Sequence, residues 1–227
     1  MSKGRINYIP ALRYKWLSPL FDPFIRLTMP EYTFKSHLIR QADIQKHSRV
    51  LDLGCGTGTL LILIKQTYPG AEVFGIDADE RIIEIARTKV NKLGLSIILE
   101  KGIASKIPYL DNSFDVILSS LVFHHLTRSN KELAFREAYR VLRPGGQLHI
   151  ADFGRPANVL MSLISLVMKN LEEVQDNYKG LLPRLFREAG FNQVEVTAQY
   201  STLFGTMCLH KGCKPVQEAR KQTTIHT

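Results

Sequence analysis

The chain has 227 residues, 44% of them hydrophobic and 22% charged, which is ordinary for a globular protein with one substantial core. Its net charge of +9 lies mostly in the two ends, because residues 41–209 carry 19 basic and 18 acidic side chains. A nearly neutral body argues against a nucleic-acid-binding protein, and it leaves weak contact of the basic ends with an anionic membrane surface as an alternative.

The three cysteines, Cys55, Cys208 and Cys213, are too few and too scattered for a disulfide framework or a CxxC metal site, and they fit a reducing compartment. No N-terminal secretory signal is expected, because a proline and two basic residues interrupt its only candidate region, 10–15. The longest apolar run, 159–168, is too short to span a bilayer. We therefore expect a cytoplasmic protein that holds no metal and touches membrane at most from one side.

Residues 1–40 mix aliphatic and aromatic side chains with several prolines, a pattern that predicts short helical turns rather than one long helix. These turns are expected to pack across the top of the domain, either as a lid over a ligand or as simple packing. The lid hypothesis places Tyr14, Trp16 and Tyr32 near the substrate. A helical pattern over 31–42 leads towards the first strand.

The first glycine-rich stretch follows an apolar segment, 49–53, that is typical of a buried parallel strand, and it opens a helical pattern over 59–68. Gly54, Gly56 and Gly58 allow a tight turn and leave no Cβ atom in the way of a ligand lying against the main chain. The sequence therefore predicts a nucleoside site at this turn.

A second apolar strand, 72–76, ends in Asp77, nineteen residues after Gly58. In a right-handed β-α-β unit this carboxylate lies beside the glycine turn, where it can accept hydrogen bonds from both ribose hydroxyls. The glycines follow a G-x-G-x-G spacing rather than the dinucleotide G-x-G-x-x-G, and Asp52 precedes them. A carboxylate there repels a pyrophosphate and suits a ligand with an ammonium group. The glycine spacing and Asp52 therefore disfavour a nicotinamide dehydrogenase. The alternative to a nucleoside site is a glycine turn that only links the strand to the helix.

The stretch from Asp52 to Gly58 closely resembles the first motif of the class I S-adenosylmethionine-dependent methyltransferases. The resemblance implies that S-adenosylmethionine is the cofactor, and that Asp77 and the glycine turn hold it. It also implies that Asp52 orients the amino group of the cofactor, directly or through water. Cys55 is expected to fill the turn as a small apolar residue and not to act as a nucleophile.

A helix over 80–93 and a third strand over 96–100 come next, and residues 101–109 then correspond to a family segment that often reads gly-asp-ala. In this chain Ile103 stands where the family has the acid that holds the adenine amino group. The resemblance thus implies that adenine rests on an apolar wall and hydrogen-bonds to the backbone near Ala104.

The fourth strand, 114–120, leads into the segment 121–126, which looks like the his-his-leu segment of small-molecule methyltransferases. It leaves the carboxyl end of a central parallel strand, where open α/β sheets bind ligands. Of His124 and His125, one is expected to pack structurally, and either is a candidate to take a proton from the substrate. No metal site is implied, since adjacent histidines need not share a face.

A helix over 129–142 precedes the turn 142–146 and a fifth strand over 147–152. The turn again matches the family's turn before that strand, and we expect it to be architectural. The strand ends at the ligand edge of the sheet, so Asp152 and Arg155 are candidate substrate contacts.

Residues 157–179 are the variable part, with a helix that is apolar nearly all round. This helix is expected to cover the substrate, and simple core packing is the alternative. A helix over 178–189 follows, and the segments 191–200 and 201–210 predict an antiparallel hairpin at the sheet edge. The composition of 211–227 suggests a disordered tail.

Together these elements predict an α/β fold: a Rossmann-like, seven-stranded, mostly parallel sheet with an antiparallel C-terminal hairpin, helices on both faces and a helical N-terminal lid. The expected organisation is a lid segment over 1–40, a methyltransferase domain over 41–210 with 157–179 as an inserted lid helix, and a tail over 211–227.

The candidate site residues fall into three groups. The expected catalytic residues are His124, His125 and Asp152. The cofactor contacts that the resemblance implies are Asp52, Gly54, Cys55, Gly56, Thr57, Gly58, Asp77, Ala78, Gly102, Ile103, Ala104, Ser119 and Ser120. The expected substrate contacts are Tyr14, Trp16, Tyr32, His124 and Arg155.

The general pattern of the chain is similar to the ubiquinone/menaquinone-biosynthesis branch of the family. This implies methyl transfer to a small, apolar or lipid-like acceptor, such as C- or O-methylation of a quinone precursor, and it rests on analogy between folds. An N- or O-methyltransferase of another small metabolite is the competing enzyme hypothesis. A methyltransferase-like protein that binds S-adenosylmethionine or its product without turnover is the alternative from a different class.

Overall fold

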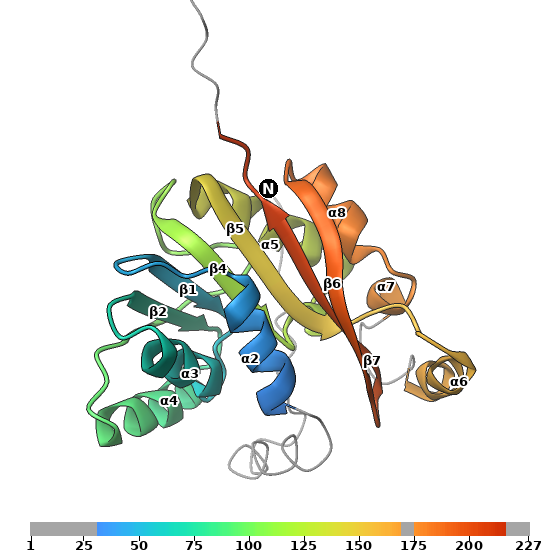
Figure 1. Cartoon of the computed structure of the whole chain (residues 1–227), viewed down its shortest axis with the longest axis horizontal. Coiled ribbons are helices and arrows are strands. Elements are labelled where there is room, and N and C mark those ends of the chain that lie inside the picture. Colours follow the sequence, from blue (N-terminus) through green and yellow to red (C-terminus); the bar gives the residue numbers. More distant parts are fainter. Residues whose placement is uncertain (1–30, 169–174, 217–227) are drawn as a thin grey trace, which may run out of the picture.

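The computed structural model describes residues 31–168 and 175–216, which form one open sheet with helices on both faces (Figure 1). The seven strands are ordered β3-β2-β1-β4-β5-β7-β6, and β7 runs antiparallel to both of its neighbours. This arrangement confirms the predicted Rossmann-like sheet and its antiparallel C-terminal hairpin. Residues 1–30, which hold most of the expected lid, lie outside the described part of the chain.

The elements follow the expected order along the chain. The strands are β1 (Arg49–Leu53), β2 (Glu72–Asp77), β3 (Ile98–Lys101), β4 (Phe114–Ser120), β5 (Leu142–Phe153), β6 (Asn192–Thr202) and β7 (Gly205–Cys213). The helices are α2 (Glu31–Gln41), α3 (Thr59–Thr67), α4 (Glu80–Lys92), the 3-10 turn η2 (Phe123–His125), α5 (Arg128–Val141), α6 (Val159–Met168), α7 (Gln175–Tyr178) and α8 (Leu182–Glu188).

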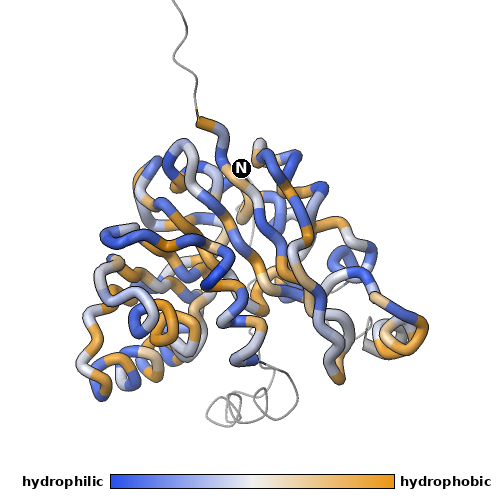
Figure 2. Tube along the Cα trace, viewed as in Figure 1, coloured by the Kyte–Doolittle hydropathy of each residue, from blue (hydrophilic) through white to orange (hydrophobic). Residues whose placement is uncertain are grey.

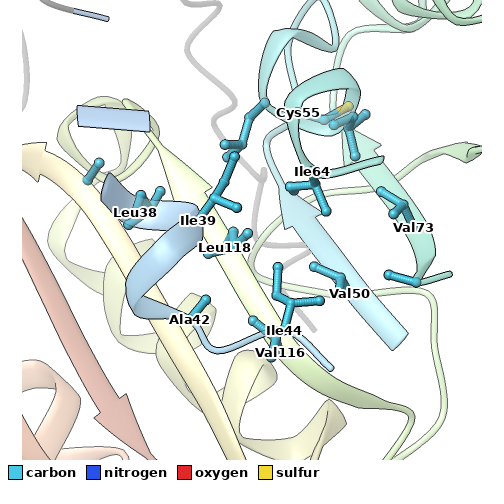
Figure 3. Packing of buried hydrophobic residues seen from close by; sticks show 14 of the residues in the cluster. Leu38, Ile39, Ala42, Ile44, Val50, Cys55, Ile64, Val73, Val116 and Leu118 are labelled. Atoms are coloured by element: carbon cyan, nitrogen blue, oxygen red, sulfur yellow. The ribbon is translucent and has the colours of Figure 1, made fainter. Parts of the chain in front are cut away.

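The core lies in two layers, one on each face of the sheet, because successive strand residues point to opposite faces. Val50 of β1 belongs to the layer that α2, α3 and α4 cover (Figure 3). Its neighbours Leu51 and Leu53 belong to the layer that α5 and α8 cover. By the same alternation, Asp52 lies on the face of the sheet that α2 covers.

The helix predicted over 178–189 begins later than expected, after a break that follows α7. α7 ends at Tyr178, and α8 begins at Leu182. Gly180 between them has a positive φ of 70°, and its amide donates to the carbonyl of Asn177 at 2.9 Å, which ends the first helix. The apolar pattern runs through this break, so periodicity alone did not reveal it.

The C-terminal hairpin turns later and runs further than predicted. β6 continues to Thr202, residues 203–204 make the turn, and β7 continues to Cys213. The expectation of a disordered tail over 211–227 is therefore wrong at its start, because β5 and β6 both pair with the last residues of β7. Residues 217–227 lie outside the described part of the chain.

The predicted turn at 142–146 is instead an irregularity inside β5. The pairing of β4 with β5 shifts its register there, and Gly145 has a positive φ of 81°. The Gly145 amide donates to the Lys214 carbonyl at 2.8 Å, and the Lys214 amide donates to the Gly146 carbonyl at 2.8 Å. A residue from the expected tail thus satisfies the backbone groups that the irregularity leaves unpaired.

α6 is the longer of the two described helices of the variable segment, and it lies beside the β6–β7 hairpin as a mostly hydrophobic element (Figure 2). Val159, Leu160 and Leu163 are exposed, whereas Met161 is buried. None of the helices in the described part of the chain is both long and apolar enough to cross a membrane. The expectation that α6 covers the substrate stays a prediction.

His210 of β7 is a buried imidazole, and neither of its ring nitrogens has a hydrogen-bond partner among the described residues. Burial lowers the pKa of His210 to about 4, against the opposing attraction of Asp152. The unfolded chain binds this proton more readily, so stability is lost as the pH falls from about 6.5 towards 4. We expect His210→Leu to raise the free energy of unfolding, measured in urea, by about 1–3 kcal/mol, with a larger gain at pH 5 than at pH 7.

His149 of β5 provides the matched control, because its ring is equally buried but hydrogen-bonded. Its Nδ1 contacts Gln41 Nε2 at 3.1 Å and its Nε2 contacts Gln147 Oε1 at 3.0 Å. His149→Leu leaves both amides without this partner, so it is expected to destabilise the protein at pH 7. A loss of stability in His210→Leu at both pH values would contradict the prediction.

Candidate functional site

The glycine turn after β1 is tied to the neighbouring strand and open on one side. The amides of Gly54 and Cys55 both donate to the Ile76 carbonyl of β2 at 2.9 Å. A Cβ atom on Gly54 would collide with the side chain of Val122, whereas a Cβ on Gly56 would meet no atom within 4 Å. The turn therefore packs tightly against the segment after β4 and leaves main chain accessible at Gly56.

Asp77, at the end of β2, lies beside this turn as the sequence predicts. Its Oδ2 accepts a hydrogen bond from the Gly56 amide at 3.0 Å, and its Oδ1 accepts one from the Asp79 amide at 3.0 Å. Burial raises the pKa of Asp77 and these backbone hydrogen bonds only partly offset it. Each oxygen retains a further acceptor position, so the carboxylate can both fix the turn and accept ligand hydroxyls.

Asp52 is the most unusual group of the site, because its carboxylate is 1% exposed and neither oxygen has a hydrogen-bond partner among the described residues. Burial raises the pKa of Asp52 to about 7, Lys35 lowers it, and Asp77 raises it further. Ser120, at the end of β4, likewise has a buried hydroxyl without a partner in the described part of the chain. Buried polar groups are normally hydrogen-bonded, so the Asp52 carboxylate and the Ser120 hydroxyl fit contact with a ligand.

Three of the expected cofactor contacts also have structural roles, and their contact with the cofactor stays a prediction. The hydroxyl of Ser119 is fully buried and donates to the Leu53 carbonyl at 2.8 Å. A Cβ on Gly58 would approach the Cβ of Ala86 to 3.1 Å, so this glycine serves close packing against α4. Burial raises the pKa of the Cys55 thiol well above its usual value, which keeps the thiol protonated, in line with its expected apolar role. The neighbouring Thr57 is also buried.

The segment expected to meet adenine lies where β3 ends, next to the end of β2. The Gly102 amide donates to the Asp77 carbonyl at 2.9 Å, and the Lys106 amide donates to the Ile103 carbonyl at 3.0 Å. This small turn leaves Ile103 and Ala104 half-buried, as is Ala78 after β2. The structure thus gathers these residues at one edge, and their contact with adenine stays a prediction.

Asp152, at the end of β5, anchors the his-his-leu segment. Its Oδ2 accepts hydrogen bonds from the amides of Val122, Phe123 and His124 at 3.1, 2.7 and 3.3 Å. Its Oδ1 accepts from the Phe153 amide, the His124 ring and the Asn177 amide group at 2.7, 2.8 and 3.1 Å.

Burial opposes the ionisation of this carboxyl, but His124 and these donors outweigh the burial, and the pKa of Asp152 is lowered. Asp152 is fully buried and its oxygens are occupied by groups of the protein itself. These contacts make Asp152 a positioning residue for the segment after β4, and its direct contact with the substrate stays a prediction.

The two adjacent histidines stack with ring centroids 3.9 Å apart, which adjacency in sequence did not require. His124 is buried and bonded to Asp152, so it is the histidine with the structural role. Burial lowers the pKa of His125 to about 3, so its ring is neutral near pH 7. A neutral imidazole can accept a proton, and this role for His125 stays a prediction. In the described ranges no cluster of His, Cys, Asp and Glu is arranged to hold a metal ion.

Comparison with known proteins agrees with this geometry. A family model described as a methyltransferase domain matches residues 50–146, which run from β1 through the bulge of β5. The demethylmenaquinone methyltransferase of Thermus thermophilus is 36% identical over 116 residues, which cover 51% of this chain and 52% of that protein. The chain is thus similar to the class I S-adenosylmethionine-dependent methyltransferases over this part of its length.

Two further comparisons extend the similarity beyond the matched domain of this family. The ubiquinone/menaquinone biosynthesis C-methyltransferase of Azotobacter vinelandii is 28% identical over 206 residues, covering 80% of this chain and 79% of that protein. A structure of phosphoethanolamine N-methyltransferase 2 from Haemonchus contortus in complex with S-adenosyl-L-methionine superposes with a TM-score of 0.67 at 16% identity, covering 81% of this chain and 53% of that one. This last similarity shows the fold alone. The chain spans about half the length of the Thermus relative.

Three of the expected substrate contacts, Tyr32, His124 and Arg155, lie in the described part of the chain. Tyr14 and Trp16 lie outside the described residues. Tyr32 of α2 is 72% exposed, so it does not line an enclosed pocket. Arg155 is exposed and lies against Gly180, where a Cβ would meet Arg155 Cβ at 3.6 Å. The contacts at the acceptor end of the site thus stay a prediction.

Sequence reasoning missed three buried polar residues near the site. Glu31 and Lys35 of α2 are 7% and 8% exposed, and Asn177 of α7 is fully buried. The first two carried a signal, because they are four residues apart and share a helix face with Ile39. Asn177 carried none, since its contact with Asp152 joins segments 25 residues apart.

Proposed function

We propose that this chain binds S-adenosylmethionine and transfers its methyl group to carbon or oxygen of a small, apolar or lipid-like acceptor of the quinone-precursor kind. The observation that carries the proposal is Asp52, a buried carboxylate without a partner among the described residues, close to a glycine turn that is open at Gly56. Such a group is costly unless a ligand cation compensates it. The amino-acid end of S-adenosylmethionine supplies an ammonium group, and a dinucleotide pyrophosphate does not.

The residues that would hold the cofactor follow from the site. Asp77 would accept the ribose hydroxyls, Asp52 the ammonium group, and Ile103 with Ala104 would line the adenine. When bound, the cofactor supplies an electrophilic methyl group. The protein's own contribution is to hold the acceptor in line with that methyl and to exclude water, which is enough for large rate accelerations. His125 is the candidate that would take a proton from the acceptor, and because burial lowers its pKa, the ring without ligand is a weak base.

The nature of the acceptor rests on two observations. The relatives named above are a demethylmenaquinone methyltransferase and a ubiquinone/menaquinone biosynthesis C-methyltransferase. In addition, α6 carries no charged residue and exposes aliphatic side chains next to the β6–β7 hairpin. Both support an apolar acceptor, which this protein would meet in the cytoplasm, with at most peripheral contact to a membrane.

Replacing Asp77 by alanine tests the cofactor site. The change removes the acceptor for the ribose hydroxyls and the hydrogen bond to Gly56, so S-adenosylhomocysteine should bind about 10–150-fold more weakly, equivalent to about 1.5–3 kcal/mol. Isothermal titration calorimetry measures this change. The matched control is Glu84→Ala, which removes an exposed carboxylate of α4 that pairs with Arg87. An unchanged affinity in Asp77→Ala would mean that the ribose lies elsewhere.

Two measurements decide the proposal as a whole. The wild-type protein should bind S-adenosylhomocysteine and not NAD in calorimetric titration, and binding of NAD alone would overturn it. With S-adenosylmethionine and a short-chain demethylated naphthoquinol, mass spectrometry should find a methylated product. Tight cofactor binding without methylation of this or any hydroxylated or amine acceptor would instead favour a protein that binds the cofactor without turnover.

A further inference from the structure

Two charged residues of α2 are buried on the face that covers the sheet. Lys35 Nζ lies 2.5 Å from Glu31 Oε1, and the two residues are 8% and 7% exposed. Removing both charges from water is costly, and an ion pair between them does not by itself repay that cost. A charged pair inside this interface therefore calls for a further partner.

The packing of α2 shows where this pair lies along the sheet. Ala42 and Ile44 lie near Val116 of β4, and Ile39, one turn earlier in the helix, lies near Leu118 (Figure 3). Four residues of a helix rise by about 6 Å, and two residues of a strand rise by about 6.6 Å, so these two steps cover similar distances along α2 and β4. One further turn back along α2 therefore brings Lys35 to the level where β4 ends, beside the glycine turn.

Asp52 lies on the same face of the sheet as this pair. Val50, two residues earlier in β1, packs in the layer under α2, and strand alternation sends Asp52 to that layer as well. The charge of Lys35 acts on the Asp52 carboxyl and favours its ionised form. The carboxyl end of β1 thus faces one buried cation and two buried carboxylates, at Lys35, Glu31 and Asp52.

We propose that Lys35 binds the carboxylate at the amino-acid end of the cofactor, held in place by Glu31, while Asp52 binds the ammonium group of the same end. This inference rests on the proposed function. The amino-acid end of S-adenosylmethionine carries a sulfonium, an ammonium and a carboxylate, that is, two positive charges and one negative. The three buried side chains carry the complementary set, one positive and two negative, so the loaded site would hold no uncompensated charge.

The test compares two ligands that differ only in the carboxylate. S-Adenosylhomocysteine has it, and 5′-deoxy-5′-(3-aminopropylthio)adenosine lacks it. Calorimetry should show that Lys35→Met binds S-adenosylhomocysteine about 10–150-fold more weakly than the wild type, the range of one hydrogen bond between charged groups. The same variant should bind the carboxylate-free ligand as well as the wild type does. Lys35→Arg, which keeps the charge, should recover most of the lost affinity.

The matched control is Lys46→Met, which removes an exposed lysine between α2 and β1 and should change neither affinity. If Lys35→Met does not fold, as judged by circular dichroism, Lys35→Gln serves for the same comparison. Equal weakening of both ligands would show a structural role only, and no weakening of either would place the carboxylate elsewhere; both results overturn the inference. A wild type that binds neither ligand would instead overturn the proposed function, and the inference with it.

Discussion

Replacing Asp152 by alanine should lower the free energy of unfolding by about 3–5 kcal/mol, the range for a buried charge network that loses one member. The carboxylate accepts hydrogen bonds from four backbone amides and two side chains, and it is fully buried. Without it the amides of 122–124 have no acceptor, and each buried donor left unpaired costs about 1–3 kcal/mol. Urea titration would measure the loss, and the melting temperature should fall by about 6–20 °C.

Asp111→Ala is the matched control for this prediction, because Asp111 is exposed and its bridge to Arg140 is one that solvent screens. That variant should change stability by less than about 1 kcal/mol. Asp152→Asn is a further test. Asparagine keeps one acceptor oxygen, but its NH2 group, which donates, replaces the other oxygen and so opposes the protein groups that donated to it. A stability loss below about 1 kcal/mol in Asp152→Ala would show that water replaces the carboxylate, and that β5 does not anchor η2 in the way described.

Replacing Asp52 by asparagine is expected to stabilise the protein without ligand and to impair ligand binding. The pKa of Asp52 is about 7 in the folded protein, above its usual 3.8, because burial disfavours the charge. Stability from this group is therefore present below about pH 4 and lost as the pH rises towards 7. Asparagine removes the charge but keeps a buried polar group, so at pH 8 the free energy of unfolding should rise by about 1–3 kcal/mol, and at pH 4 it should not.

Binding should change in the opposite direction. At pH 8 the wild type presents an ionised carboxylate to the ammonium group, so Asp52→Asn should bind S-adenosylhomocysteine about 10–150-fold more weakly in calorimetry. Asp43→Asn, at an exposed position, should change neither quantity. A variant that is less stable than the wild type at pH 8 but binds equally well would show that Asp52 has a structural partner and is not a ligand group.

The two predictions expect opposite effects on stability when two similarly buried carboxylates, Asp152 and Asp52, are replaced. Asp152 stabilises the fold because protein donors surround it, whereas Asp52 destabilises the fold because none of the described residues donates to it. Their burial alone does not separate them, since both are at most 1% exposed. Hydrogen-bond partners decide which one the fold needs and which one is available to a ligand.

The sheet, the glycine turn and the position of Asp77 were predictable from the sequence alone, because each depends on short-range patterns. Apolar runs of five to seven residues fix buried strands, and the G-x-G-x-G spacing fixes the turn. The right-handed crossover then requires the end of β2 to meet that turn, and the Asp77 contact with Gly56 agrees.

The contacts of Asp152, the burial of Lys35 and the pairing of residues beyond 210 were not predictable from the sequence. Asp152 looked like a substrate contact because it ends a strand at the ligand edge, but its donors come from η2 and α7, which are distant in sequence. Lys214 looked like part of a tail, yet the irregularity of β5 offers its backbone two partners. Hydrogen bonds of this kind form between segments that local periodicity does not relate, so their pairing exists only once the sheet is assembled.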